Sequence, residues 1–525
     1  LPICIHLYVN ANMVEHVDVT GELPKFENET LWIGRNLQDL GPIGSERSAS
    51  FEIGSKMIIH GLLDEISLYA EALTQQQISS SYETQLPTNR QPLNYYALPT
   101  PSNDSVFRAY YTRLEYAQEW EHTWRVGDHP DIVVSFDQLP VKYVFWRGTG
   151  YGGVWVSESG IWMADQSLER AGKGKSPLGC SEHMSDKQTR YSQVKIIEKT
   201  DARIVLHWRY ALSDILYNVY GAESTTDWGE WAEEYYYIYP DGVSTRFQKL
   251  WSDYLSHEWQ ETIVIHQPGQ RPEDNIESDA LTLANEAGEH MTYSWSNAVP
   301  KTFENPADVN VQLVNIKSRF KPFIIFENEV KIKPFTGGIR PSISRFPWWN
   351  HWPVAQLPND GRQALDADRP SHSSLSQGME NSPVIHAHED GTFSAVSLTG
   401  MTQHSIEWLV NLSRSWNHAP KVSSYSDNVD SVYYQKHQRA YVIQCALPKN
   451  KIEVRITASA KSPLIHPAFV ITNWRSGNHV FDLKVNGDLL KRSEYRVGYE
   501  QGSDQLVIWM NKAFFEIVTI EFSSS

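Results

Sequence analysis

The chain has 525 residues, of which 41% are hydrophobic, and it carries a formal net charge of −17. That length exceeds one ordinary core, so we expect about two to four domains. The acidic balance argues against nonspecific binding to nucleic acid or to an anionic membrane, and no stretch reaches the roughly 18 consecutive apolar residues of a membrane span.

The chain begins at Leu1, and its natural start is expected to lie upstream. Residues 1–84 alternate between apolar and polar side chains, which predicts half-buried antiparallel strands. The segment 61–74, GLLDEISLYAEALT, resembles the last strand and short helix of a laminin-G/concanavalin-like sandwich. We therefore expect the C-terminal part of such a module, followed by a linker over residues 85–105, which are rich in Pro, Asn and Ser.

Residues 106–400 hold many runs of β-forming residues with turn signals between them, such as Tyr239-Pro240-Asp241-Gly242. No long stretch has the period of a helix, which predicts one large antiparallel sheet or two packed sheets. The size of this central domain and its succession of strands resemble the super-β-sandwich of galactose mutarotase and of several polysaccharide lyases. Residues 401–525 predict a helix over 403–412 and then a smaller β-sandwich with a turn at 485–488. The expected fold class is all-β.

Three segments interrupt the strand pattern and concentrate polar, cationic and aromatic residues, as functional loops do. The first covers residues 179–192 and contains His183, Arg190 and Tyr191, together with acidic side chains. It could equally be a solvated surface loop. The hydrophobic blocks on both sides of it favour the functional interpretation.

The second segment covers residues 345–356 and places three tryptophans around one histidine, between two prolines that argue against a central strand. An aromatic face can stack on the C–H face of a pyranose, so this segment is typical of a wall of a sugar cleft. The alternative is an aromatic plug between domains. The candidate residues are Trp348, Trp349, Asn350, His351, Trp352 and Gln356.

The third segment covers residues 359–376, where Arg362 and Arg369 flank His372 in a sequence of low apolar content. Arginine binds carboxylate or sulfate through two parallel N–H groups. Histidine can accept a proton near neutral pH. The alternative is a long polar surface loop.

Other chemistries find less support. The sequence contains no motif of a serine hydrolase, zinc protease, P-loop or dinucleotide fold, and Tyr151-Gly152-Gly153 predicts a glycine turn. Cys4, Cys180 and Cys445 make no zinc or disulfide pattern. An acidic run could supply a glycosidase pair or a Ca²⁺ site, although a solvated turn is favoured. Its members are Asp227, Glu230, Glu233 and Glu234.

Several segments together resemble the core of large secreted proteins from marine, polysaccharide-degrading bacteria. They are WMADQS, GCSEHMSDKQTRYS, ARIVLHWRYAL, EYYYIYPDGV, QETIVIHQPGQRPEDNIE, FPWWNHWPVAQ and RPSHSSLS, within residues 140–420. The family they resemble is the ulvan-lyase-like polysaccharide lyases, which cleave uronate-containing, sulfated algal polysaccharide. The resemblance implies a secreted, periplasmic or cell-surface protein whose partner is an acidic polysaccharide or oligosaccharide.

A lyase of this kind neutralises the uronate carboxylate, removes the C5 proton and protonates the leaving oxygen at C4. The resemblance implies His351 and His372 as the proton-handling residues, Tyr191 as the acid and His183 as a further catalytic candidate. The expected substrate-binding residues are Arg190, Asn350, Gln356, Arg362, Arg369, Trp348, Trp349 and Trp352.

This chemistry requires no cofactor, although a structural Ca²⁺ is compatible with the fold class and no ligand spacing is diagnostic. We expect a monomer. Because a net charge of −17 would repel an acidic substrate, the hypothesis requires the three loops to form a local cationic cleft walled by tryptophan. The alternatives are a uronyl oligosaccharide dehydratase with the same proton chemistry, a glycoside hydrolase that uses the acidic run, and a non-catalytic glycan-binding protein.

Overall fold

A computed structural model gives the arrangement of most of the chain. The residues it describes are 3–9, 11–19, 66–67, 69, 71–85, 96–101, 106–120, 126–166, 168–170, 181–214, 217–253, 257–296, 304–328, 330–335, 344–348, 352–353, 369–379, 384–424, 426–427, 429–447, 451–474, 481–500 and 504–524.

The N-terminal part forms a compact unit of its own, separate from the unit that holds the residues from 96 onward. Its strands β1 (Ile3–Val9) and β2 (Asn12–Val19) pair as an antiparallel hairpin. Helix α1 (Gln75–Gln85) begins directly after the laminin-G-like segment, and the Thr74 hydroxyl donates to the side chain of Gln77 at its first turn. Most of the predicted strand in that segment lies outside the described residues.

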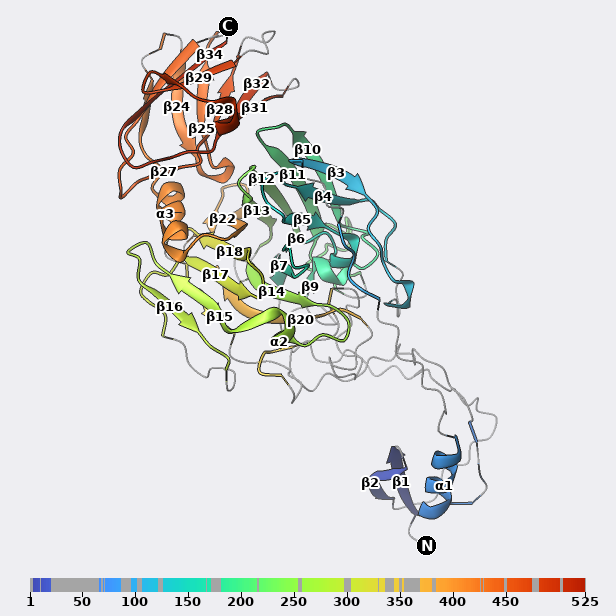
Figure 1. Cartoon of the computed structure of the whole chain (residues 1–525). Helices are drawn as coiled ribbons and strands as arrows, with labels where there is room; N and C mark the ends of the chain where they lie inside the picture. The colour runs from blue at the N-terminus through green and yellow to red at the C-terminus, as the bar shows by residue number, and fades with distance from the viewer. Residues whose placement is uncertain are drawn as a thin grey trace. The chain divides into compact units, whose positions relative to one another are not determined.

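The largest sheet of the second unit has ten strands, whose order is given by their hydrogen bonding (Figure 1). They are β10 (Gln193–Lys199), β11 (Ile204–Ala211), β12 (Trp231–Ile238), β13 (Val243–Trp251), β22 (Thr392–Thr402), β18 (Lys321–Phe326), β17 (Val311–Ile316), β15 (Ile276–Ala284) and β16 (His290–Tyr293), with β21 (His386–Ala387) paired to β22.

A second sheet has eight strands and packs on the first. They are β19 (Lys333–Pro334), β20 (Ser371–Gly378), β14 (Gln260–His266), β7 (Trp162–Gln166), β6 (Gly153–Val156), β5 (Lys142–Phe145), β4 (Asp131–Ser135) and β3 (Arg108–Thr112). Short elements between and beside the two sheets are α2 (Pro272–Asn275), η1 (Gln118–Trp120), η2 (Arg147–Thr149), η3 (His183–Ser185), β8 (Glu169–Arg170) and β9 (Ser181–Glu182).

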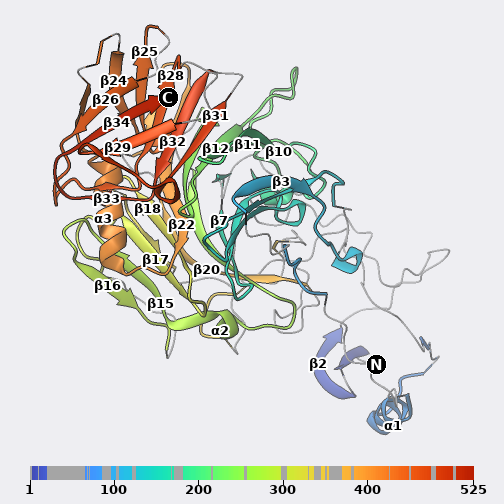
Figure 2. The ribbon, with the colours of Figure 1, turned by 45° about the horizontal axis from the view of Figure 1, so that its top comes forward.

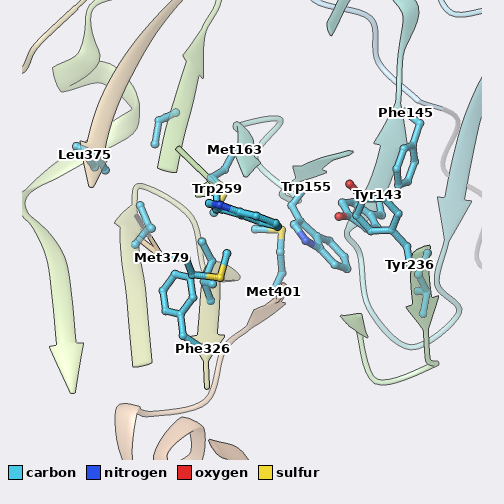
Figure 3. Close-up of a cluster of buried hydrophobic side chains, with 14 of the residues drawn as sticks. Tyr143, Phe145, Trp155, Met163, Tyr236, Trp259, Phe326, Leu375, Met379 and Met401 are labelled. Atoms are coloured by element: carbon cyan, nitrogen blue, oxygen red, sulfur yellow. The ribbon is translucent and has the colours of Figure 1, made fainter. Parts of the chain in front are cut away.

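The main core lies between these two sheets (Figure 3). The ring of Tyr236 on the ten-stranded sheet meets Tyr143 and Phe145 on the eight-stranded sheet edge to face, at centroid distances of 5.8 and 4.9 Å. The Trp155 indole donates a hydrogen bond across the gap to the hydroxyl of Thr399 at 3.0 Å. Alternate residues of β12 are buried, because successive side chains of a strand point to opposite faces of the sheet.

An ion network is buried between the sheets. Arg246 on β13 binds both carboxylate oxygens of Glu234 at 2.7 and 3.0 Å and Asp165 on β7 at 3.0 Å. The hydroxyls of Tyr210 and Tyr236 also donate to Glu234. Burial raises the pKa of Asp165. Glu234 is therefore part of the protein interior. The expectation of a solvated turn around this residue is wrong.

A smaller β-sandwich follows at the C-terminus. Its two five-stranded sheets enclose a separate apolar core. One sheet contains β23 (Val422–Ser424), β26 (Lys451–Ile456), β34 (Val518–Ser524), β29 (Phe481–Val485) and β30 (Asp488–Leu489), and the other contains β24 (Val429–Gln435), β25 (Ala440–Cys445), β28 (Ala468–Thr472), β32 (Gln505–Met510) and β31 (Tyr495–Glu500). The remaining elements here are β27 (Leu464–Ile465), β33 (Ala513–Phe514), η5 (Lys436–Gln438) and η6 (Arg492–Glu494).

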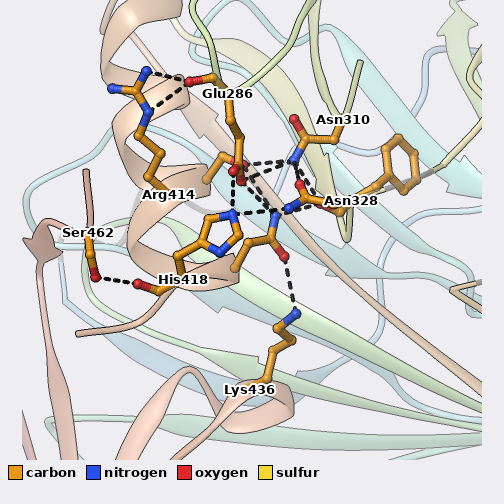
Figure 4. Close-up of polar contacts among 10 residues, drawn as sticks. Glu286, Asn310, Asn328, Arg414, His418, Lys436 and Ser462 are labelled. Atoms are coloured by element: carbon orange, nitrogen blue, oxygen red, sulfur yellow. Dashed lines mark hydrogen bonds and ion pairs between the residues drawn. The ribbon is translucent and has the colours of Figure 1, made fainter. Parts of the chain in front are cut away.

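Helix α3 (Ile406–Asn417) follows the last long strand of the ten-stranded sheet, close to the predicted range 403–412. Polar contacts bind its C-terminal end to the loop between β15 and β16 (Figure 4). The Glu286 carboxylate pairs with His418 at 2.7 Å, and the Glu286 carbonyl accepts a hydrogen bond from Arg414 at 2.8 Å. The apolar side of α3, which includes Leu409, packs in a cluster that also contains Phe323.

The turn between β12 and β13 contacts the C-terminal sandwich. Asp241 in this turn forms an ion pair with Arg439 at 2.6 Å, and the Tyr239 hydroxyl donates to the Gln438 carbonyl at 2.7 Å. The predicted hairpin turn is confirmed by the antiparallel pairing of β12 with β13 and by the positive φ of Gly242. The all-β prediction is confirmed as well. Within the described ranges, no helix is long and apolar enough to cross a membrane.

Candidate functional site

An open pocket of about 720 Å³ lies where the edges of the two large sheets come together. The edge strands β3 and β10 lie side by side in both views (Figure 1, Figure 2), and the backbone N–H of Ile196 donates to the Tyr111 hydroxyl between them at 3.0 Å. The residues that line the pocket are Tyr111, His129, Pro130, Tyr151, Thr189, Arg190, Tyr191, Ser192, Gln193, Val194, Lys195, Arg209 and Trp231.

The charge of this lining is one-sided. It includes Arg190, Lys195 and Arg209, and none of the described lining residues is Asp or Glu. Among the described residues, Arg190 and Lys195 have no ion pair, and the closest carboxylate oxygen to Arg209 is on Glu233 at 3.9 Å. Such a concentration of cations on a chain of net charge −17 favours an anionic ligand at this place.

The predicted residues Arg190 and Tyr191 both lie in this lining. The Asp186 carboxylate holds them, since it accepts hydrogen bonds from the backbone N–H of Arg190 at 2.8 Å and of Tyr191 at 2.7 Å. Burial raises the pKa of Asp186 to about 6. The Tyr191 hydroxyl donates to the carbonyl of Tyr217 at 3.2 Å, and the Arg190 guanidinium lies 3.9 Å from the centre of the Tyr217 ring.

Tyr151 contributes a second phenol to the pocket. It follows η2 and has φ +67, a left-handed conformation that is uncommon for a bulky side chain and that often marks a functional site. Its hydroxyl is buried and has no hydrogen-bond partner among the described residues. Burial raises the pKa of Tyr151 above its ordinary value, so this phenol stays protonated at neutral pH.

Ser192 connects the loop of Tyr151 with the loop of Tyr191 through hydrogen bonds. The Ser192 hydroxyl donates to the Gly150 carbonyl at 3.2 Å and accepts from the Trp208 indole at 2.9 Å. Because Ser192 follows Tyr191 and Gly150 precedes Tyr151, this contact fixes the two tyrosines relative to each other.

His183 lies behind the pocket and is not part of its lining. It is fully buried against Trp208 and Tyr210, and a side chain at Gly152 would come within 2.8 Å of its ring. Burial lowers the pKa of His183 to about 3, so the imidazole is neutral at physiological pH. His183 therefore supports the turn that carries Tyr151. This structural role fits its buried position better than the predicted catalytic role does.

His129 also lines the pocket and is exposed. Its loop packs on the loop of Arg190, because Gly127 donates to the Lys187 carbonyl at 3.2 Å and a side chain at Gly127 would collide with Thr189. This close approach places an imidazole within electrostatic reach of Asp186.

A second group of predicted residues is brought together at the start of β20. The Trp348 indole donates to the Ser371 hydroxyl at 2.7 Å, and His372 contacts Trp352 through its ring and through the Trp352 carbonyl. Trp348, Trp352, Arg369 and His372 are all buried, so in this structure neither tryptophan offers a face to a sugar. The prediction of a loop over 371–376 is wrong, since these residues form an inner strand of the eight-stranded sheet.

The remaining predicted residues lie outside the described part of the chain. They are Trp349, Asn350, His351, Gln356 and Arg362. Their proposed roles stay predictions.

The acidic run does not form a carboxylate pair facing the pocket. Glu230 is buried and binds His257 at 2.9 Å and the Ser252 hydroxyl at 2.6 Å, while Glu234 belongs to the buried ion network. The expectation of a solvated turn is wrong for Glu230 too. Among the described residues, the carboxylates of Glu169, Glu258 and Glu261 lie within 4.8 Å of one another and could hold a cation such as Ca²⁺, which prefers oxygen ligands.

Several residues of the pocket were not predicted from the sequence, namely Tyr111, His129, Tyr151, Lys195, Arg209 and Trp231. The last three are on strands with ordinary alternation, and only sheet packing brings them to the loop of Tyr191. One signal was present in the sequence, because a tyrosine enclosed by glycines at positions 150, 152 and 153 suggests an unusual backbone at that position.

No known family model and no curated protein matches the chain. Solved structures with distant similarity include the galactose 1-epimerase from Lactobacillus acidophilus NCFM, at 9% identity and a TM-score of 0.27, over 56% of this chain and 99% of that one. Heparinase III is 7% identical, with a TM-score of 0.25, over 68% and 41%. A Paenibacillus xanthan lyase is 8% identical, with a TM-score of 0.27, over 74% and 38%. The chain thus spans about two fifths of each lyase, and TM-scores this low carry no argument about activity.

Proposed function

We propose that this protein is a polysaccharide lyase that cleaves a uronate-containing, sulfated polysaccharide of the ulvan type by β-elimination in the pocket around Tyr191. One observation carries the proposal. A pocket that combines three cations, one histidine and three tyrosines has no carboxylate among its described lining residues. Anion binding and proton transfer are the two requirements of this reaction, and the lining offers groups for both.

Arg190 and Lys195 are suited to the substrate anions. Neither has an ion pair among the described residues, and Arg190 is stacked on Tyr217, which orients its guanidinium. A guanidinium can bind a carboxylate through two N–H groups, while an ammonium acts as a point charge. We assign the uronate carboxylate to Arg190 and a neighbouring sulfate to Lys195.

His129 and Tyr191 are suited to the proton transfers. The His129 imidazole takes the C5 proton, the electron pair of that C–H bond forms the C4=C5 double bond, and the C4–O bond breaks as Tyr191 protonates the leaving oxygen. The products are an unsaturated uronate and a new sugar end. The bond from the Tyr191 hydroxyl to the Tyr217 carbonyl is 3.2 Å long and can be exchanged for one to a substrate oxygen.

Tyr151 complements this pair. Its hydroxyl has no acceptor among the described residues, and its raised pKa keeps the proton on the oxygen. It can therefore donate a hydrogen bond to the substrate carboxylate as negative charge accumulates there in the enolate-like intermediate.

The deciding experiment is a substrate panel of ulvan, alginate, chondroitin and heparin, followed by the absorbance of unsaturated uronate and by product mass. The expected result is rising absorbance and shorter products with ulvan. Tyr191→Phe should abolish this, while the matched Tyr433→Phe, at an exposed tyrosine of the C-terminal sandwich, should not. Unsaturation without shortening would identify a dehydratase instead, new reducing ends without unsaturation would identify a hydrolase, and no change with any polymer would refute catalysis on uronate polymers.

A further inference from the structure

Beside the pocket, the loop between β11 and β12 presents Trp228 on the surface. Trp228 is 45% exposed. The loop holds it in place, since Glu223 donates its backbone N–H to the Trp228 carbonyl at 3.0 Å and Asp227 donates to the Glu223 carbonyl at 2.9 Å. The indole is thus displayed on an ordered loop.

A second tryptophan and an arginine complete a platform, which we define as Trp228, Trp231 and Arg209. The two indoles are stacked, with centroids 5.3 Å apart and an interplanar angle of 13°. The Arg209 guanidinium lies 5.4 Å from the Trp228 ring and 5.0 Å from the Trp231 ring. The Arg209 side chain is 41% exposed, and its contact with the Glu233 carboxylate is long, at 3.9 Å.

The platform is continuous with the pocket, because Trp231 and Arg209 also line it while Trp228 lies outside that lining. A chain of sugars that places one residue in the pocket therefore meets the platform next. Aromatic rings stack on the apolar face of a pyranose, and a guanidinium binds the carboxylate or sulfate that such a residue carries.

We infer that this platform binds a further residue of the same anionic glycan chain, with Trp228 stacked on the sugar and Arg209 bound to its acidic group. The inference rests on the proposed function, and it makes the protein one that prefers long substrates over short ones. The acidic run around Asp227 then has a role that the sequence did not suggest, since it positions an aromatic residue for binding rather than carboxylates for hydrolysis.

The test compares polymer with the shortest ulvan oligosaccharide that is still cleaved. Trp228→Ala should raise KM for the polymer about tenfold, as expected for the loss of one stacking contact, and leave kcat/KM for the oligosaccharide unchanged. Trp228→Phe, which keeps a ring, should lose less, and the control Tyr433→Ala should match the wild type. Equal effects on both substrates, or none on the polymer, would overturn the inference.

A binding measurement separates this inference from the proposed reaction. In gels that contain ulvan, the wild type should be retarded and Trp228→Ala should be retarded less, whether or not the polymer is cleaved. Retardation of the wild type without cleavage would contradict the lyase and still support the platform. Equal retardation of both proteins would contradict the platform, even if cleavage is observed. Thermal unfolding of each variant shows that it is folded.

Discussion

The Asp186 carboxylate accepts a hydrogen bond from the backbone N–H of Tyr191 at 2.7 Å, and thereby sets the position of a ring that lines the pocket. The same carboxylate accepts from the backbone N–H of Arg190. A single buried acid thus places a proposed proton donor and a proposed carboxylate ligand together. Its raised pKa makes this arrangement sensitive to pH.

Asp186→Asn should change how stability depends on pH. Burial raises the pKa of Asp186 from an ordinary 3.8 to about 6 in the folded protein, so the folded state binds a proton that the unfolded state has released between these values. The stability that this proton gives is fully present below about pH 4 and is lost as the pH rises through about 6, with a total of about 3 kcal/mol. Urea unfolding at pH 4 and pH 7 measures this effect. Between these two pH values, the free energy of unfolding of the wild type should fall by about this amount relative to that of the variant. An unchanged difference between the two proteins would mean that folding does not raise the pKa of Asp186.

Arg190→Gln and Lys195→Gln should each raise KM for an anionic substrate about tenfold, which corresponds to the loss of one charged contact. Both variants should also show a weaker dependence of KM on ionic strength, since fewer charges remain to be screened. Steady-state kinetics from 0.05 to 0.5 M salt measures both effects. Arg455→Gln, at an exposed arginine of the C-terminal sandwich, is the matched control and should behave as the wild type. KM values equal to that control would exclude the two residues from substrate binding.

Arg246→Met should destabilise the protein by about 3–5 kcal/mol, because it leaves the buried Glu234 and Asp165 without their cation. Arg246→Lys keeps a charge but loses the two-point contact with Glu234, so its cost should be smaller. Denaturant midpoints give the comparison, with Arg455→Met as the exposed control, which should lie within about 0.5 kcal/mol of the wild type. A small effect of Arg246→Met would show that the network does not hold the sheets together.

Asp241→Asn should weaken the contact between the central sheets and the C-terminal sandwich. Burial alone would raise the pKa of Asp241, but Arg439 and the hydrogen bond from His466 hold it below the ordinary value. Because the folded pKa is depressed, the stabilisation is present above about pH 4 and is lost as the pH falls below that value. The variant should therefore unfold at a lower temperature than the wild type at pH 7, and the gap should narrow toward pH 3. A difference in unfolding temperature that stays constant with pH would contradict the ion pair as the cause of the difference.

Much of the fold follows from local patterns. Alternation of apolar and polar residues predicted the all-β class, and the turns at 239–242 and 485–488 are confirmed by the pairing of β12 with β13 and of β29 with β30. The predicted loop over 371–376 failed because SHSSLS is polar, yet small hydroxyl side chains can be buried in a strand when they find partners. The Ser373 hydroxyl is one example, bound to His266 at 2.9 Å.

The site was predictable only in part. The loop of Arg190 and Tyr191 has a local signature, since it breaks the strand pattern and carries charge. Lys195, Arg209 and Trp231 have none, because each occupies the outward position of an ordinary strand and becomes part of a pocket only when β10, β11 and β12 lie side by side. The burial of Glu234 could not be predicted from the acidic run either, because its partner Arg246 lies on the next strand.

The cation-lined pocket on an acidic chain also has a kinetic consequence. At low ionic strength, where the screening length is about 30 Å, an approaching polyanion meets the field of the whole molecule, which is repulsive at a net charge of −17. At about 0.15 M salt the screening length falls to about 8 Å, so the distant repulsion disappears before the attraction of Arg190 and Lys195 at contact is lost. Added salt should therefore accelerate the encounter while it shortens the lifetime of the complex. Turnover of a polymer would then pass through a maximum at intermediate salt rather than fall steadily, as it does for proteins whose surface attracts polyanions from a distance.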